Sequence, residues 1–423
     1  MSDKVVFSPF ERRASLVLSG VYGLRMLGLF LVLPVLALGV ADMPGGQDPA
    51  AIGLAMGIYG LTQAFFQIPF GMASDRFGRK PVITFGLLVF AAGSFLAAWA
   101  DSLAVLVLGR ALQGAGAVSA AVSAFLADLT REEVRARAMA MVGVSIGLSF
   151  VVSLVLAPPL YGAYGLEGLF LLTGVLAVVA ALGVTRMRTR PPPPAHSPPS
   201  NTEDAQAVSA LPLGQALAKV SAWPLLSHSQ LWRLNLGIFS LMAVQTAMFV
   251  AIPMGFDELG LPLKDHWKAY LPLLILAFLG ILPPIFWAER NGRFRPVFLA
   301  AIGLLAFTML GFLFFDGQGL IAWLAFVCLF FMGFNLLEAL LPSWVSRVAP
   351  FGQRGLALGI YNTSQSLGLF VGGLVGGLML AAFGRGGIFV ACALLLAFWG
   401  MMTLGLKELG RRSPTRPSPS NGE

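Results

Sequence analysis

The chain has 423 residues, of which 57% are hydrophobic and 11% are charged, and its formal net charge is +8. A soluble fold of this size cannot cover its surface with so few charged residues, so the composition excludes one and predicts a chain that lies mostly in a lipid bilayer. The positive charge lies in loops on one side of the predicted helices, which argues against nucleic acid as a partner.

Twelve apolar runs are long enough to cross a membrane, which takes about 20 residues for about 30 Å of hydrocarbon. They start near residues 14, 50, 82, 103, 138, 167, 231, 269, 297, 320, 355 and 386. The first run lacks a small-residue cleavage site and is followed by eleven more, so it is typical of an anchor and not of a signal peptide. Lipid cannot satisfy backbone polar groups, so we expect an all-α membrane protein.

A long polar stretch, RPPPPAHSPPSNTEDAQ, separates the sixth run from the seventh. Its prolines predict a semi-extended tether. We therefore expect a six-helix bundle over 1–187, a cytoplasmic linker with a short amphipathic helix within 188–229, a second six-helix bundle over 230–410 and a disordered tail over 411–423.

The basic residues are unequally divided between the two sides of the membrane. With the N-terminus in the cytoplasm, 23 Lys and Arg lie inside, three lie outside and two lie within spans. This asymmetry follows the positive-inside rule and predicts that both termini are cytoplasmic, in a multi-pass protein of the cytoplasmic (inner) membrane.

Two sequence segments of the first half recur in the second half, which indicates an internal duplication. The loop over 71–80, GMASDRFGRK, recurs in weaker form over 288–297 as AERNGRFRPV. The segment GLAMGIY over 53–59 recurs as GLALGIY over 355–361, in spans of opposite direction. A true match would be an inverted repeat; the alternative is that any membrane helix uses these residues.

The first loop also carries a charge pattern that suggests a latch. Asp75 can accept hydrogen bonds from the exposed amides that open a neighbouring helix, an interaction that the helix dipole favours. In the alternative, Arg76, Arg79 and Lys80 only orient the chain and contact anionic headgroups. That alternative explains neither Asp75 nor the glycines.

GMASDRFGRK resembles the signature loop of the major facilitator superfamily, and LVLGRALQGAGAV over 106–118 resembles its fourth-helix pattern. The runs RMLGLFLVLPVL, GIYGLTQAFFQIPFG, GRALQGAGA and FNLLEALLPS are similar to the YajR-type branch of proton-driven drug exporters. Members of that branch can carry a C-terminal cytosolic domain, which we do not expect here. The exporters' fifth-helix motif ends in Gly-Pro, whereas this chain has Ala157 before Pro158.

The resemblance implies a cytoplasmic gate. Asp75 would meet the start of the eleventh span, and Arg79 would pair with Asp128. We expect these contacts to stabilise the state closed on the cytoplasmic side and to break as that side opens. The predicted gate residues are Gly71, Asp75, Arg76, Gly78, Arg79, Lys80 and Asp128, with Glu289, Arg290 and Arg293 as the second-half counterpart.

Three ionisable residues lie deep in predicted spans, and each is costly there unless it faces a cavity or a partner. The resemblance places spans one, four, seven and ten around a central cavity. Glu338 is the deep carboxylate and the candidate for proton coupling; the alternative is a permanent ion pair with Arg25 or Arg110. The predicted cavity residues are Arg25, Tyr59, Gln63, Arg110, Gln113, Gln245, Asn335 and Glu338.

Two functions remain open from the sequence. One is a proton-coupled antiporter that exports amphipathic drugs or metabolites by alternating access. The other is a carrier of a specific small anion or metabolite that uses Arg25 and Arg110. The chain has no nucleophile-and-base set, metal-ligand spacing or phosphate loop, so we expect no enzyme, cofactor or metal. The expected partners are a small-molecule substrate, protons and the lipid bilayer, with the protein a monomer.

Overall fold

The computed structural model describes residues 7–187, 228–349 and 354–406, so most of the predicted linker, with its amphipathic helix, and the tail lie outside the described residues. The described part is helical. In the first half the helices are α1 Pro9–Gly39, α2 Pro49–Phe77, α3 Arg79–Ala98, α4 Leu103–Ala115, α5 Ser119–Asp128 and α6 Glu132–Arg186. In the second half they are α10 Ser229–Glu258, η1 Leu263–Asp265, α11 Trp267–Asn291, α12 Phe294–Phe314, α13 Leu320–Val348 and α14 Arg354–Thr403.

Ten segments of the described chain are long and apolar enough to cross a membrane. One of them joins α4 and α5 across a break at residues 116–118. Two others lie in helices of unusual length, since α6 has 55 residues and α14 has 50. Each of these two helices contains one glycine in a non-helical conformation.

The bends in α6 and α14 are alike. Gly165 has φ 63° and ψ −168°, and Gly384 has φ 65° and ψ −164°. Such positive φ values suit glycine because it has no Cβ. An aromatic residue precedes each bend and a second glycine follows it three residues later; a Cβ added to Gly168 would lie 2.3 Å from the Tyr164 Cβ. The same bend therefore recurs at the same place in each half.

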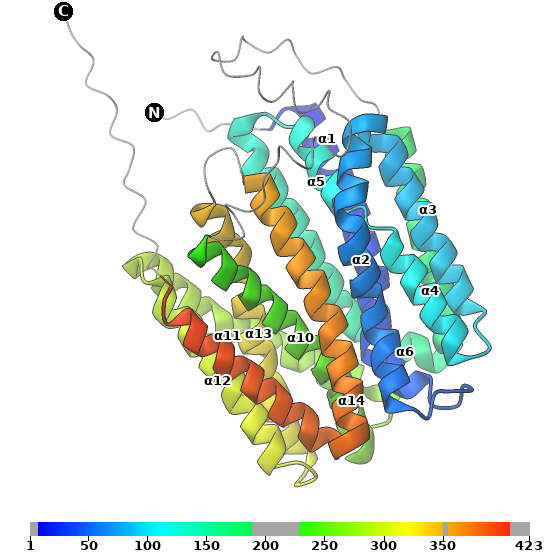
Figure 1. Ribbon diagram of the computed structural model, residues 1–423, viewed down its shortest axis with the longest axis vertical. Helices are drawn as coiled ribbons and strands as arrows, with labels where there is room; N and C mark the ends of the chain where they lie inside the picture. Colours follow the sequence, from blue (N-terminus) through cyan, green and yellow to red (C-terminus); the bar gives the residue numbers. More distant parts are fainter. Residues whose placement is uncertain (1–6, 188–227, 350–353, 407–423) are drawn as a thin grey trace, which may run out of the picture.

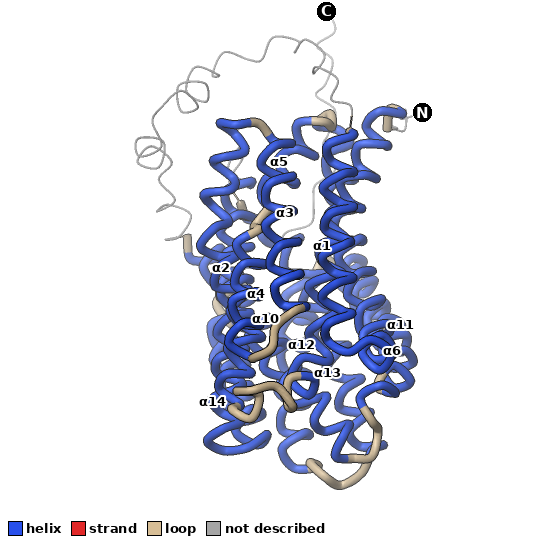
Figure 2. The backbone as a smooth tube through the Cα atoms, turned by 90° about the vertical axis from the view of Figure 1, so that its right-hand side faces the viewer, coloured by secondary structure: helices blue, strands red, loops and turns tan. Residues whose placement is uncertain are grey.

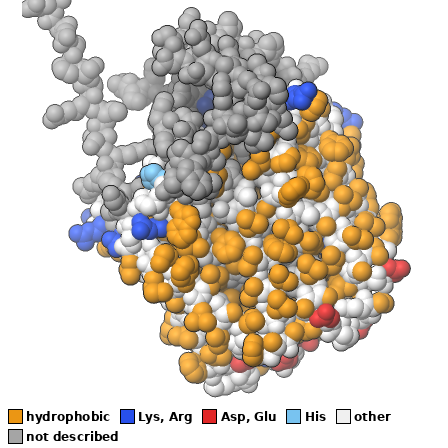
Figure 3. All heavy atoms as spheres, in the orientation of Figure 1, with side chains coloured by type: hydrophobic (Ala, Val, Ile, Leu, Met, Phe, Trp, Pro, Cys, Tyr) orange, Lys and Arg blue, Asp and Glu red, His pale blue; other side chains and the backbone are white. Residues whose placement is uncertain are grey.

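The helices form two bundles, α1–α6 and α10–α14, that run between the same two ends of the molecule (Figures 1 and 2). We call the end where α6 stops and α10 starts the linker end, and the opposite end the far end. Figure 3 shows Lys and Arg near the linker end, Asp and Glu near the far end and a band of hydrophobic side chains between them. This is the surface expected of a protein that spans a bilayer.

Local signals fix where the first helix begins. Ser8 and Glu11 form a capping box at the start of α1, which satisfies amides that have no partner within the helix. The buried Glu11 carboxylate also accepts hydrogen bonds from Arg131, at 2.9 Å from Nε and 3.0 Å from the backbone N. The linker end of α1 is thereby tied to the residue that caps α6.

The two bundles touch closely at the far end, where α2 crosses α14. A Cβ added to Gly53 would lie 2.3 Å from the Gly373 O, and one added to Gly57 would lie 2.5 Å from the Phe370 O. Only glycine allows backbones to approach so closely. Within the described residues, Gly71 near the linker end of α2 meets only Ala120 of its own half.

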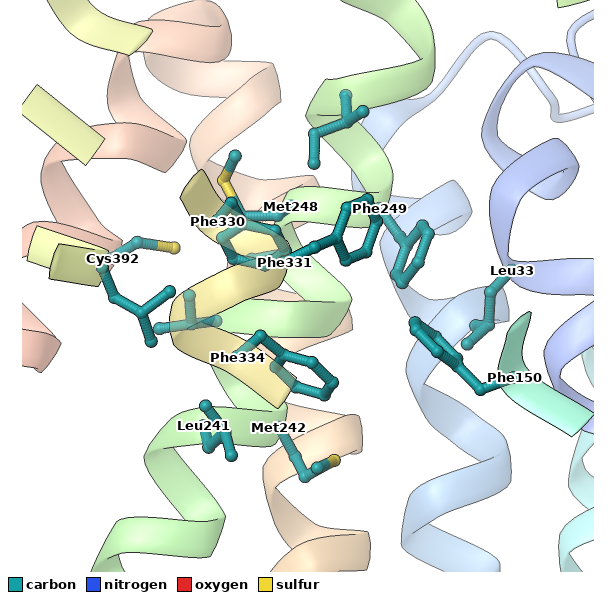
Figure 4. Close-up of a cluster of buried hydrophobic side chains, with 14 of the residues drawn as sticks. Leu33, Phe150, Leu241, Met242, Met248, Phe249, Phe330, Phe331, Phe334 and Cys392 are labelled. Atoms are coloured by element: carbon teal, nitrogen blue, oxygen red, sulfur yellow. The ribbon is translucent and has the colours of Figure 1, made fainter. Parts of the chain in front are cut away.

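An aromatic contact closes the far half of the interface as well (Figure 4). The Phe150 ring of α6 packs against three rings of the second bundle, with centroid distances of 6.3 Å to Phe249, 6.2 Å to Phe331 and 6.0 Å to Phe334. These residues belong to one hydrophobic core that spans both bundles. A second core near the linker end contains residues of the first bundle alone.

Candidate functional site

Arg25 of α1 lies in the interior of the first bundle, where only 1% of its surface is exposed. Its NH1 donates to the Ser119 Oγ at 2.8 Å and its NH2 to the Tyr59 OH at 2.6 Å. Both acceptors are neutral. The guanidinium also lies 5.8 Å from the centre of the Phe90 ring, a distance at which a cation is attracted to an aromatic face.

Arg110 of α4 is fully buried in the same network. Its NH1 donates to the Gln113 Oε1 at 2.9 Å, and the Gln113 Nε2 donates to the Ser94 Oγ at 2.8 Å. The guanidinium carbon lies 5.2 Å from the centre of the Tyr59 ring. Tyr59 therefore contacts both buried arginines.

The network has no acidic member within the described residues. Neither arginine forms an ion pair there, and the Arg25 Nε and Arg110 NH2 are buried without a hydrogen-bond partner. The site thus holds two positive charges with free donors. Groups of this kind are stabilised by an acceptor or an anion.

The second bundle contains a separate set of polar residues. Gln245 of α10 and Asn335 of α13 are buried, and the Gln245 Oε1 and Asn335 Nδ2 have no hydrogen-bond partner in the described part. Glu338, one turn after Asn335, is partly buried and lies near Tyr361 of α14. In this structure it has no ion pair with Arg25 or Arg110.

The structure brings four of the predicted cavity residues together: Arg25, Tyr59, Arg110 and Gln113. Gln63 is buried one turn after Tyr59, outside these hydrogen bonds. The network also uses Ser94 and Ser119, which sequence reasoning missed. Serine is common in membrane helices as packing and polar glue, so neither position carried a signal.

The predicted gate loop lies at the linker end, between α2 and α3. The Arg79 Nε donates to the Asp128 Oδ2 at 2.9 Å, and the Arg79 NH1 donates to the Ser74 Oγ at 2.8 Å. Arg79 also pairs with Asp75, whose side chain is 64% exposed. Gly78 separates the two helices at a φ of 91°, a conformation that favours glycine.

Three further gate residues, Arg76, Arg290 and Arg293, are exposed at the same end. Arg76 lies over the Phe77 ring at 5.4 Å. In the second-half loop, Arg290 lies in the last turn of α11 and Arg293 precedes α12, while the side chain of Glu289 lies outside the described residues. Gly292 has a left-handed conformation with φ 66°, and it shares with Gly78 only the positive sign of φ.

Lys80 and Arg295 make equivalent contacts in the two halves. The Lys80 Nζ donates to the Met187 O just beyond α6, and the Arg295 NH2 donates to the Leu404 O just beyond α14. Each side chain therefore holds the end of the last helix in its own half. Both residues precede Pro-Val. Matching the loops at Pro-Val would have found Arg295, which sequence analysis missed because the second loop has one extra residue.

Two helical bundles with ionisable residues buried in their spans define the class: an integral membrane transporter built of two related halves. The chain belongs to the Major Facilitator Superfamily, whose family model matches residues 18–368 and 285–423. It is therefore a transporter and not an enzyme.

Among characterised relatives, the chain is 43% identical to the inner membrane transport protein YajR of Escherichia coli K12, over 95% of this chain and 85% of that protein. It is 23% identical to multidrug resistance protein 1 of Bacillus subtilis, over 84% and 87% of the two chains. The first similarity makes the chain a YajR-like member of the superfamily and a multi-pass protein of the cytoplasmic (inner) membrane.

Solved structures show the same fold. A bacterial homologue of the human lysosomal transporter Spinster, in an inward-facing and unoccupied conformation, matches with a TM-score of 0.72 at 16% identity, over 94% of this chain and 98% of that one. A D-xylose-proton symporter matches with a TM-score of 0.73 at 14% identity, over 93% and 98% of the two chains. At these identities the likeness concerns the fold alone.

Proposed function

We propose that the chain is a twelve-span, proton-coupled antiporter that exports amphipathic drugs or metabolites by alternating access. One observation carries this proposal: the two bundles are in contact at the far end, through the glycines where α2 crosses α14 and through Phe150. At the linker end, by contrast, the charged residues pair within one half. In this proposal the linker end is cytoplasmic, in keeping with its Lys and Arg, and the structure represents the state that opens inward.

The twelve spans follow from the two bends. A helix rises 1.5 Å per residue, so the 55 residues of α6 would extend about 80 Å if straight. That length far exceeds the hydrocarbon core of about 30 Å. Dividing α6 at Gly165 and α14 at Gly384 gives each half six spans.

The α2 and α14 register supports the latch. Residues that face each other at the far end, such as Gly57 with Phe370, have numbers that total 426 to 430, as antiparallel helices require. The same register continued to the linker end would bring Asp75 to Arg354, where α14 starts. Asp75 would then leave Arg79 for the open helix terminus when the cytoplasmic side closes. The expected break on opening would therefore concern Asp75 alone, because the Arg79–Asp128 pair is formed in this structure.

Proton coupling is assigned to Glu338. Its carboxylate has no ion pair with the two buried arginines in this structure, so it can bind and release a proton without breaking a permanent pair. Export of amphipathic compounds is supported by the similarity to a protein described as a multidrug resistance protein.

The unpaired arginines favour a second candidate function. Arg25 and Arg110 have free donors and neutral partners, an arrangement that suits an organic or inorganic anion. A carrier of one specific small anion is therefore the alternative.

Purified protein in lipid vesicles with an imposed pH gradient tests both functions. Uptake of cationic dyes and of organic acids is followed in parallel, with the gradient present and collapsed. We expect dye transport that depends on the gradient. Acid transport alone would favour the anion carrier, and rates that ignore the gradient for every compound would overturn the antiporter.

A further inference from the structure

His266 lies just before α11 at the far end and is fully buried. Its Nε2 is 2.9 Å from the Leu261 O. Because a carbonyl oxygen only accepts, Nε2 carries the hydrogen and Nδ1 is the bare nitrogen of the neutral ring. Nδ1 is buried and has no partner in the described part of the chain. A second proton would therefore create a buried N–H without an acceptor.

Two aromatic rings pack against the imidazole, and a series of ring contacts leads from them to the interface between the bundles. The His266 ring is 5.2 Å from Phe256 and 6.2 Å from Tyr270. The Tyr270 ring is 6.3 Å from Phe331, which in turn contacts Phe150 of the first bundle. Charge on the imidazole would thus arise inside the packing that closes the far end.

The segment before His266 touches the first bundle directly. A Cβ added to Gly162 of α6 would lie 2.9 Å from the Lys264 Cβ in η1. His266 therefore lies close in sequence to the contact between Lys264 and Gly162. Through Tyr270 it also packs against Phe331, which contacts the first bundle. Displacement of this residue would loosen both contacts.

The charged groups around His266 do not provide it with a partner. Asp257 at the end of α10 and Asp265 in η1 act on the ring electrostatically. Asp265 is already paired with Lys268, at 2.7 Å between Oδ1 and Nζ. Tyr270 is the titratable group that packs on the ring from α11, and its OH is buried without a partner.

We propose that His266 is a proton-binding switch on the outer side, whose protonation opens the far end of the transporter. The neutral ring fits the closed packing, whereas the protonated ring places an unpaired charge there. By linkage, acid shifts the equilibrium toward the state in which the ring reaches water. The proposal rests on the alternating access proposed above.

Distances between spin labels on the two far-end surfaces test the switch. The labels are attached at Asp101→Cys and Gln318→Cys, with Cys328 and Cys392 replaced by serine, in lipid nanodiscs at about pH 8 and about pH 5.5, the range in which histidine titrates. Acid should raise the ratio of long to short distances by roughly threefold to tenfold. In His266→Gln, whose amide can still donate to Leu261, this response should be lost.

His228→Gln is the matched control, because His228 caps α10 at the linker end and should leave the acid response intact. If the glutamine variant does not fold, His266→Asn replaces it. An unchanged acid response in the folded His266 variant overturns the switch, as does a wild-type protein whose distances ignore pH. Either result can coexist with gradient-driven vesicle transport, so failure of the switch is distinguishable from failure of the antiporter.

Discussion

At the scale of single residues, two buried guanidiniums are held by neutral groups. Tyr59 contributes twice, because its OH accepts from Arg25 and its ring lies beside both arginines. Such hydrogen bonds to charged groups contribute about 1.5–3 kcal/mol each, whereas a cation beside an aromatic ring gains roughly 0.5–2 kcal/mol. The hydroxyl should therefore matter at least as much as the ring.

Tyr59→Phe separates these contributions, since it removes the hydroxyl and keeps the ring. We expect the apparent melting temperature of the purified protein to fall, corresponding to a loss of about 1–3 kcal/mol. Tyr164→Phe is the control, because Tyr164 is mostly exposed and should leave the melting curve unchanged. If the two variants had the same apparent melting temperature, the hydrogen bond from Arg25 to Tyr59 would not stabilise the fold.

Glu338→Gln tests proton coupling at a single residue. A glutamine keeps the shape of the side chain but cannot exchange a proton, so transport should become insensitive to the imposed pH gradient. Initial rates in vesicles across a range of pH measure this effect. If the variant keeps the wild-type pH dependence, Glu338 does not lie on the proton pathway.

At the scale of the helices, the crossing of α2 and α14 depends on glycines, which have no side chain to keep the two backbones apart. Gly57→Leu would drive carbon atoms into the Phe370 backbone, and overpacking of this kind typically costs about 1–3 kcal/mol. The far-end spin labels should then report open molecules roughly tenfold more often. Gly303→Leu is the control, since an added Cβ there meets nothing within 4 Å.

Asp75→Asn tests the latch between the same two helices. The amide keeps the size of the side chain but loses the charge that a helix terminus favours, so transport should fall several-fold while the amount of inserted protein stays the same. Vesicle transport normalised to protein content gives the measurement. Wild-type rates from a folded Asn variant would argue against the latch.

Apolar runs of about 20 residues are strong signals, so most spans could be placed from the sequence. The predicted starts near 50 and 320 agree with α2 at Pro49 and α13 at Leu320. The predicted gap before residue 167 is instead a bend inside α6, because one glycine turns the chain without ending the helix. Phe150 gave no signal, since 33 phenylalanines in the chain look alike until the bundles meet.

At the scale of the whole molecule, the bends and the charge asymmetry together define a topology that chemical labelling can test. Residues 167 and 382 lie beside the bends at Gly165 and Gly384, and residue 291 lies at the linker end; all three are exposed. Cysteine is placed at each position in turn, with Cys328 and Cys392 replaced by serine. If both bends face the outside, a membrane-impermeant maleimide should label Glu167→Cys and Ala382→Cys in intact cells.

Asn291→Cys should react only after the membrane is opened, because the basic linker end is expected on the cytoplasmic side. Opened cells are also the control that each cysteine is reactive. The labelling results at the two bends are the more informative ones, because each half has an even number of spans only if α6 and α14 each cross the bilayer twice. Protection of both bend positions in intact cells, with reaction in opened ones, would place the bends inside and contradict the arrangement of two six-span halves.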